Sequence, residues 1–299
     1  MMLGRAELIG AITTFLGGRD GQTMERMRAT LERELDAAGP RALEELNLRF
    51  ETAGTEWTYC PPDPLARRVH HVLAEEILDR RSMVTGLEHL ASVRGQPTVM
   101  LANHLSYSDA NLLEILLHRA GETSVSDRLT VVAGPKVYSS LKRRFSSLCF
   151  GTIKTPQSTA LSSEEAVMHP REVARLARQC IDIALDRVRR GETLLVFAEG
   201  TRSRTCGMQQ TLAGVARYLE WPGTQVLPVG LTGTEVMFPI GEEALHDVAI
   251  VARIGPPIDA EALRARHDGD RHAIMDDIGR AIAERLPEEY RGVYGELSL

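Results

Sequence analysis

The chain has 299 residues, of which 43% are hydrophobic and 25% are charged, and these values exclude a disordered or collagen-like protein. This length predicts one large domain with a smaller appendage. The net charge of −6 disfavours a general nucleic-acid-binding protein.

The cysteines and the amino-terminal segment indicate the cellular compartment. The four cysteines are widely spaced and form no C-x-x-C pair, which argues against a disulfide framework and a zinc knuckle. Glu7 interrupts the first apolar segment and no convincing cleavage site follows it, so we expect no signal peptide. No apolar run approaches the roughly 20 residues that cross a bilayer. We therefore expect a cytoplasmic protein without a membrane span.

Residues 1–82 predict a small helical domain. Apolar residues recur there at steps of three and four, as in an amphipathic helix; they include Met24, Met27, Leu31, Leu35, Leu43 and Leu46. The segment CPPDP interrupts this pattern, and Asp63 with Pro64 predicts the start of a further helix that runs toward Leu78.

From residue 83 to residue 299, short apolar runs alternate with longer amphipathic ones. We expect strands at 84–90, 97–103, 129–134, 193–199, 225–231 and 247–255. We expect helices near 109–119, 137–145, 170–190, 207–219 and, with a break, 260–286. Gly121 is suited to end the first of these helices. The alternation predicts an α/β domain with a mainly parallel central sheet that is flanked by helices.

The basic residues are unevenly placed. All three lysines, Lys136, Lys142 and Lys154, lie in one short segment that also contains Arg143 and Arg144. One interpretation is a docking surface for an anionic ligand or an anionic membrane. The other is a solvated helix face that keeps the protein soluble.

His104 and Asp109 follow an expected strand and precede an expected helix, which is where open α/β folds carry their sites. A carboxylate bonded to one ring nitrogen fixes the tautomer of a histidine and stabilises the imidazolium. A spacing of five separates the two side chains on a regular helix, so His104 must lie in the turn and Asp109 in the first helical turn. The alternative is structural, because Ser106 and Asp109 also fit a capping box.

A second cluster, FAEGTRS at 197–203, follows another expected strand. Gly200 lets the backbone approach a ligand, Arg202 offers a planar fork for phosphate, and Thr201 adds a hydroxyl. Glu199 is suited to accept a hydrogen bond from a substrate hydroxyl or to hold Arg202. The alternative is a polar loop with a surface Glu–Arg pair, which contributes little stability.

The two clusters together resemble the glycerolipid acyltransferases, which include glycerol-3-phosphate and 1-acylglycerol-3-phosphate acyltransferases. Asn103, His104 and Asp109 match the NHxxxxD motif of that family, and residues 197–203 match its FPEGTRS motif except at Ala198, where proline is usual. Weaker matches lie at Gly134 to Lys136, with Phe145, Gly151 and Thr152, at 226–231 around Pro228, and in the tail from Leu286. The resemblance covers residues 83–299.

The resemblance implies direct acyl transfer. His104, oriented by Asp109, removes the proton from an acceptor hydroxyl, which attacks the thioester carbonyl of an acyl-CoA or acyl carrier protein. It implies that Glu199, Gly200 and Arg202 line the acceptor site, with Arg202 on the acceptor phosphate. It further implies substrate-binding roles for the remaining positions, which are Asn103, Lys136 and Thr201.

The same resemblance implies no cofactor and no acyl-enzyme, and the chain has no G-x-S-x-G elbow. It has no dinucleotide-binding glycine motif, Walker A loop or HExxH either. His70, His71 and Glu75 imitate metal-ligand spacing, but with no third ligand nearby we expect a solvated helix face and no metal site.

Several alternatives stay open. The acceptor is glycerol-3-phosphate, a lysophospholipid, or another lipid or natural-product hydroxyl or amine, and a third reading is a non-catalytic lipid-binding protein of the same fold. The lysine segment and the poor solubility of the products motivate peripheral contact with an anionic membrane. The donor carrier, chain-length preference and oligomeric state are not determined by the sequence.

Overall fold

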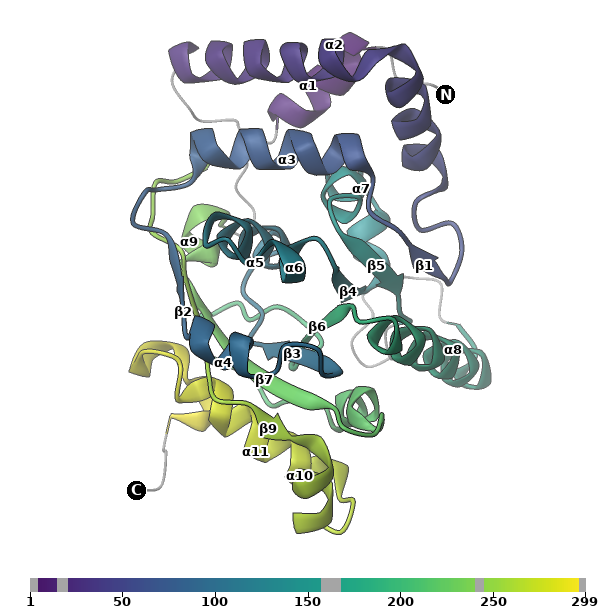
Figure 1. Ribbon diagram of the computed structural model, residues 1–299, viewed down its shortest axis with the longest axis vertical. Coiled ribbons are helices and arrows are strands. Elements are labelled where there is room, and N and C mark those ends of the chain that lie inside the picture. Colours follow the sequence, from purple (N-terminus) through teal and green to yellow (C-terminus); the bar gives the residue numbers. More distant parts are fainter. Residues whose placement is uncertain (1–4, 15–20, 157–167, 240–244, 296–299) are drawn as a thin grey trace.

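The computed structural model describes residues 5–14, 21–156, 168–239 and 245–295 (Figure 1). A single sheet runs through it in the order β1-β5-β4-β6-β3-β7-β8-β2, and β9 pairs with β7. Five of the strand pairs are parallel and three are antiparallel, so the expected mainly parallel sheet is confirmed. The strands are β1 (Tyr59–Cys60), β2 (Met83–Thr85), β3 (Thr98–Ala102), β4 (Leu129–Ala133), β5 (Gly151–Lys154), β6 (Thr193–Phe197), β7 (Gln225–Thr232), β8 (Val251–Ile254) and β9 (Ile258–Asp259).

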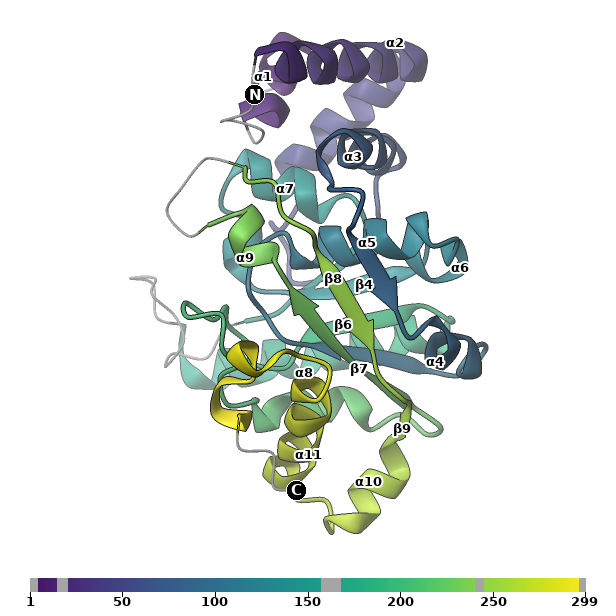
Figure 2. The same cartoon turned by 90° about the vertical axis from the view of Figure 1, so that its left-hand side faces the viewer.

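Helices cover both faces of this sheet (Figures 1 and 2). The α-helices are α1 (Arg5–Thr14), α2 (Gly21–Thr52), α3 (Pro64–Ile77), α4 (Leu87–Ser92), α5 (Asp109–Arg119), α6 (Thr123–Ser126), α7 (Leu141–Ser147), α8 (Pro170–Arg189), α9 (Thr234–Met237), α10 (Ala260–Arg266) and α11 (Arg271–Ala283). The 3₁₀ helices are η1 (Pro135–Tyr138), η2 (Ala213–Leu219), η3 (Glu288–Tyr290) and η4 (Gly292–Tyr294).

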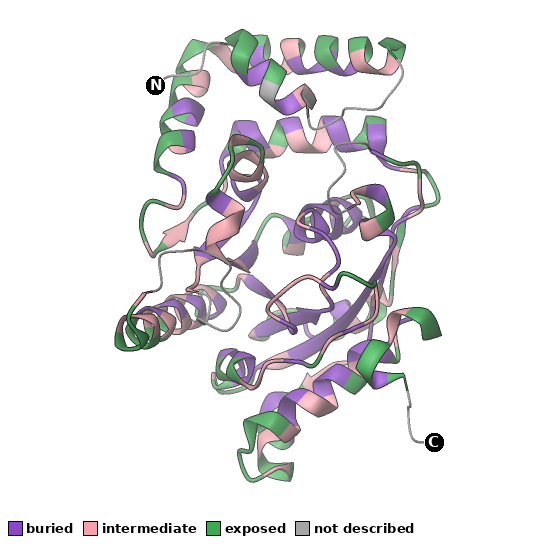
Figure 3. Ribbon diagram, turned by 180° about the vertical axis from the view of Figure 1, so that it is seen from behind, coloured by how far each residue is buried: buried purple, intermediate pink, exposed green. Residues whose placement is uncertain are grey.

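Strand β3 is buried along its whole length, as most of the central sheet is (Figure 3), because its alternate side chains enter two different cores. Met100 and Ala102 pack into one core with residues of α1, α2, α3 and α5. Val99 and Leu101 pack into the other with residues of α8, η2 and α11. The continuous apolar run of β3 is therefore explained by the two helical layers.

The amino-terminal helices lie beside α5 and α7, at the end of the molecule opposite α10 (Figures 1 and 2). Helix α3 starts as predicted, because Asp63 accepts hydrogen bonds of 2.9 Å from the backbone amides of Leu65 and Ala66. Helix α2 bends at Gly39, which has a φ of 78° and precedes Pro40. Side chains of α1 to α3 share one core with the sheet, and the division at residue 82 stays a prediction.

Most predicted elements form close to the expected positions, and three expectations are wrong. Of the predicted strand 84–90, only Val84 and Thr85 are extended, because Gly86 has a φ of 80° and α4 follows it. In the predicted helix 207–219 only η2 is helical, since the backbone amide of Leu212 bonds instead to the carbonyl of Ala198. The predicted helix 137–145 is divided into two elements, because η1 ends at Tyr138 and Ser140 caps the start of α7 at Leu141.

Among the helices that the structure describes, none combines the length and the apolar character that crossing a bilayer requires.

Candidate active site

The two sequence clusters meet at one edge of the sheet. Strands β3 and β6 are parallel neighbours, with Ala102 opposite Phe197 at their carboxyl ends. The turns that follow them, 103–108 and 198–203, therefore emerge side by side. This is the edge at which open α/β sheets place their ligands.

His104 and Asp109 form the predicted pair. His104 Nδ1 lies 2.8 Å from Asp109 Oδ2, and the carboxylate is fully buried whereas 15% of the histidine side chain is exposed. The ring of His104 stacks on Phe197, with centroids 4.1 Å apart and 16° between the planes. An Nδ1–H that donates to Asp109 leaves Nε2 as the proton acceptor, and no described residue bonds to Nε2. This arrangement leaves Nε2 able to accept a proton, as a general base requires.

Asp109 also accepts hydrogen bonds from backbone amides of the turn, as the structural alternative for this residue predicts. Its carboxylate accepts hydrogen bonds from the backbone amides of Leu105, at 2.7 Å, and Ser106, at 3.0 Å. The buried hydroxyl of Thr234 donates to Asp109 Oδ1 at 2.6 Å. One side chain thus closes the turn before α5 and orients the histidine.

Glu199 is buried and does not pair with Arg202. Its Oε1 accepts a hydrogen bond of 2.8 Å from the backbone amide of His104, and its Oε2 accepts one of 2.8 Å from the amide of Gln209. The backbone amide of Ser203 donates to the carbonyl of His104 at 2.8 Å. Burial raises the pKa of Glu199 to about 7, although its two backbone donors act against this. The second turn therefore holds the histidine backbone from both sides.

Asn103 joins two strands. Its side-chain amide donates to the carbonyl of Leu231 at 3.0 Å and accepts from the amide of Leu231 at 2.7 Å. The residue is fully buried. Its amide thus continues the pairing of β3 with β7 beyond Ala102 and fixes the point at which the chain turns toward His104.

Gly200 and Ala198 shape the second turn. Gly200 has a φ of 66°, a left-handed conformation that glycine adopts without strain, and Thr201 follows it at the partly exposed surface. The backbone amide of Ala198 donates to the carbonyl of Ala102 at 2.9 Å. Proline has no amide hydrogen. With alanine in place of the usual proline, the chain therefore gains one more backbone hydrogen bond between the ends of β3 and β6.

Some of the basic residues lie at the site, and others form structural hydrogen bonds. Arg202 lies over the ring of Tyr107, with Cζ 3.7 Å from the ring centre, and Arg143 lies over the same ring at 4.0 Å. Arg143 also donates to the carbonyl of Lys136 at 3.1 Å, which links η1 to this group.

Two other basic residues of the segment bond to backbone carbonyls away from Tyr107. Arg144 bonds to the carbonyls of Tyr138 and Phe50, and Lys154 bonds to the carbonyl of Gly54 at 2.6 Å. Lys142 is exposed on α7. The three lysines therefore do not act as a single solvated helix face.

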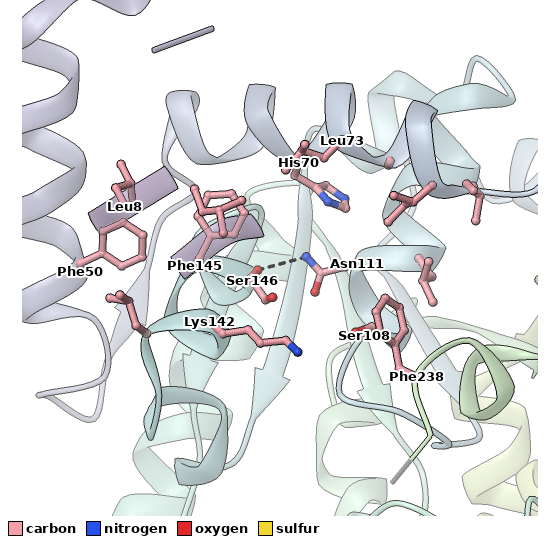
Figure 4. A pocket seen from close by; sticks show the side chains of 16 residues that line it. Leu8, Phe50, His70, Leu73, Ser108, Asn111, Lys142, Phe145, Ser146 and Phe238 are labelled. Carbon is pink, nitrogen blue, oxygen red and sulfur yellow. Dashed lines mark hydrogen bonds between the residues drawn. The ribbon is translucent and has the colours of Figure 1, made fainter. Parts of the chain in front are cut away.

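An apolar pocket opens beside the first turn of α5, between α1, α3 and α7 (Figure 4). Ser108, which directly precedes Asp109, and Asn111 line it from the α5 side. Leu73 and Ala74 line it from α3, and Phe145 lines it from α7. The pocket brings an apolar surface to within one helical turn of the His104–Asp109 pair.

The histidines of α3 do not form the solvated face that the sequence predicts. His71 Nε2 lies 3.0 Å from Glu114 Oε1, and Arg67 pairs with the same fully buried carboxylate at 2.7 Å. Burial raises the pKa of Glu114, but His70 and His71 outweigh it and hold that pKa at about 2. Because α3 packs on α5, these side chains turn inward rather than toward Glu75. Among the described residues, no group of three or more histidine, cysteine or carboxylate side chains is arranged to hold a metal ion.

Three residues of the site have no part in the sequence interpretation, namely Tyr107, Phe197 as a stacking partner, and Thr234, and Arg143 enters it only as a member of the basic segment. A sequence signal existed for Thr234. It follows Gly233 at the end of β7, and the carboxyl end of β7 lies beside that of β3. The signal depends on knowing that these two strands are neighbours.

The chain is similar to known proteins in a family model, a sequence comparison and a structural comparison. The family model described as Acyltransferase matches residues 81–232. A 1-acyl-sn-glycerol-3-phosphate acyltransferase of Chlamydomonas reinhardtii is 30% identical over 135 residues, which are 44% of this chain and 38% of that protein. The crystal structure of the 1-acyl-sn-glycerophosphate acyltransferase PlsC from Thermotoga maritima has a TM-score of 0.47 and 18% identity, and the match covers 73% of this chain and 76% of that one.

Proposed function

The chain belongs to the Acyltransferase family, whose model matches residues 81–232, and on that premise we propose that it transfers a fatty acyl group from an acyl thioester to a hydroxyl of 1-acylglycerol-3-phosphate or glycerol-3-phosphate. The observation that carries this proposal is the 2.8 Å contact between His104 Nδ1 and the buried carboxylate of Asp109. The matching curated relative is named for the first of these acceptors.

In this proposal His104 is the general base. Nε2 takes the proton of the acceptor hydroxyl as its oxygen attacks the thioester carbonyl, and the thiol leaves with a proton returned from the imidazolium. The negative charge of Asp109 stabilises that imidazolium and keeps the ring oriented. No covalent enzyme intermediate is formed.

In this scheme Glu199 and Asn103 act by holding His104 in place. Both carboxylate oxygens of Glu199 accept hydrogen bonds from backbone amides, those of His104 and Gln209. Both polar atoms of the Asn103 side chain bond to the backbone of Leu231. We therefore assign them to holding the turn that carries His104. Arg202, on the partly exposed side of the second turn, binds the acceptor phosphate with Gly200 and Thr201 beside it. Lys136 supplies further positive charge from η1.

The apolar pocket beside α5 receives the acyl chain. A fatty acyl chain gains about 0.8 kcal/mol for each methylene group that it removes from water. The lining from α1, α3 and α7 offers such a surface next to the catalytic pair (Figure 4). Acyl-CoA and acyl carrier protein are the two donors to be tested.

The deciding experiment offers glycerol-3-phosphate and 1-acylglycerol-3-phosphate, each with acyl-CoA and with acyl carrier protein, and identifies the products by mass spectrometry. A phosphorylated mono- or diacylglycerol that appears only with active protein supports the proposal. Absence of any product with all four combinations contradicts it.

We also propose that the protein works in the cytoplasm and contacts an anionic membrane peripherally. Lys142 on α7 is exposed beside the apolar pocket that it helps to line, and the products of the reaction remain in the lipid phase. Co-sedimentation with liposomes that contain anionic lipid should exceed that with neutral liposomes and should fall at high salt. Failure to bind liposomes at low and at high salt contradicts this part of the proposal.

A further inference from the structure

We propose that Arg143 is a second phosphate-binding residue and that it acts with Arg202 to select acceptors that carry a phosphate monoester. This inference rests on the proposed function and adds a specificity-determining residue from α7, outside both sequence motifs. Its basis is that two guanidinium groups gather around Tyr107, three residues after His104.

The geometry places two positive charges close together. Cζ of Arg143 and Cζ of Arg202 lie 4.0 Å and 3.7 Å from the centre of the Tyr107 ring. The two Cζ atoms therefore lie no more than 7.7 Å apart, which is about one Debye length at physiological ionic strength, so the two charges repel. Their contacts with the ring offset part of this repulsion, because a guanidinium is attracted to the face of an aromatic ring.

No carboxylate among the residues that the structure describes forms an ion pair with Arg143 or Arg202. Arg67, in contrast, is neutralised by Glu114 and Asp127. An anion at the edge of the Tyr107 ring that reaches both Arg143 and Arg202 offsets their mutual repulsion and gains charge-assisted hydrogen bonds. The arrangement is therefore a site for a negatively charged group.

Arg143 is also held in place rather than free to swing. Its Nη1 donates to the carbonyl of Lys136 at 3.1 Å and to the hydroxyl of Ser139 at 3.0 Å. These bonds leave its other guanidinium nitrogens for a ligand. A fixed fork loses less conformational freedom on binding than a flexible lysine does.

The charge of this site favours one class of acceptor. A phosphate monoester carries nearly two negative charges above its second pKa of about 6, whereas a phosphodiester carries one. Two uncompensated guanidinium groups match the first class. We therefore expect glycerol-3-phosphate and lysophosphatidate to bind better than lysophospholipids whose phosphate is a diester.

The test has a binding arm and a kinetic arm. Calorimetry measures the binding of glycerol-3-phosphate and of the diester glycerophosphocholine to the full chain. Assays in mixed micelles measure KM and kcat with lysophosphatidate and with lysophosphatidylglycerol of the same chain length. Arg143→Gln should weaken monoester binding and raise the monoester KM about ten- to hundredfold, with kcat within about twofold and a smaller effect on the diester.

Three variants separate charge from structure. Arg143→Lys should restore part of the monoester affinity. Ser139→Ala removes one bond to Arg143 without removing its charge and should stay within about twofold of the wild type, as should Arg41→Gln on the exposed side of α2. Melting curves confirm that each variant folds.

The outcomes are distinct for the two proposals. If Arg143→Gln binds glycerol-3-phosphate as the wild type does, or weakens monoester and diester equally, Arg143 is not a phosphate selector. Failure of the wild type to bind glycerol-3-phosphate also overturns the inference. If the wild type binds glycerol-3-phosphate and Arg143→Gln does not, but no acyl group is ever transferred, the anion site stands and the proposed function fails.

Discussion

The backbone amide of His104 donates a hydrogen bond of 2.8 Å to the buried carboxylate of Glu199. The two residues come from different turns, one after β3 and one after β6. The acidic residue of the second cluster therefore sets the position of the histidine of the first. Glu199 forms no ion pair with any described residue. Its hydrogen bond to the backbone of His104 is the reason that it belongs to the site.

His104→Ala should lower kcat by about a thousandfold or more while the protein folds normally, because a positioned general base contributes about 10²–10⁴ in rate. Mass spectrometry of the product checks the loss of kcat, and a melting curve checks that the variant folds. His272→Ala, at an exposed position of α11, is the matched control and should keep the parental rate. A folded His104→Ala protein with undiminished kcat would exclude the proposed base.

Thr234→Val should reduce kcat about tenfold with little change in KM. The substitution removes the hydroxyl that donates to Asp109 at 2.6 Å, and Asp109 then orients His104 less firmly. Steady-state kinetics, which give kcat and KM separately, check this expectation. Thr232→Val removes a buried hydroxyl two positions earlier on β7, away from Asp109, and should leave kcat near the wild-type value. Equal losses in both variants would indicate a general packing effect.

Glu199 should make the stability depend on pH in a stated direction. Its folded pKa of about 7 lies above the ordinary value of 4.5 that it has in an unfolded chain. Between these values the folded protein holds a proton that the unfolded chain has released, so the free energy of unfolding falls as pH rises from about 4.5 to 7. The expected contribution is about 3 kcal/mol at most, from 1.36 kcal/mol per pKa unit.

Urea unfolding of wild type and Glu199→Gln at several pH values checks this expectation. The free energy of unfolding of the variant minus that of the wild type should increase with pH across the window, because glutamine does not ionise. Glu44→Gln, at an exposed position of α2, should show the wild-type slope. A constant difference between Glu199→Gln and wild type at all pH values would show that Glu199 does not titrate there.

Ala74→Leu should shift the acyl preference toward shorter chains. Ala74 lines the apolar pocket from α3 and is 4% exposed, so a larger side chain takes space from the acyl chain. Displacing about two methylene groups costs about 1.6 kcal/mol, roughly a tenfold loss for hexadecanoyl relative to decanoyl donors. Competition assays with mixed donors measure this ratio.

Ala37→Leu, the same substitution at an exposed position of α2, should leave the ratio of the two donors unchanged. If Ala74→Leu also leaves it unchanged while folding normally, the pocket does not hold the acyl chain.

The sequence predicted the parts of the site that depend on local order along the chain. A strand followed by a turn and a helix is sufficient to place His104 before Asp109, and the observed bond between them follows from that local path. Helix α5 matches its predicted range because Asp109 and Gly121 mark its two ends. The expected family, named from Asn103, His104, Asp109 and residues 197–203, is confirmed by the match at 81–232.

Only the tertiary structure decided which polar side chains of the two clusters bond to the backbone. Glu199 and Asn103 resemble ligand-binding residues in the sequence, but they bond to backbone groups of His104 and Leu231. Thr234 and Arg143 reach the site from other elements. These contacts depend on β6 and β7 both lying beside β3, and the order of strands in a sheet results from packing between distant segments rather than from local spacing.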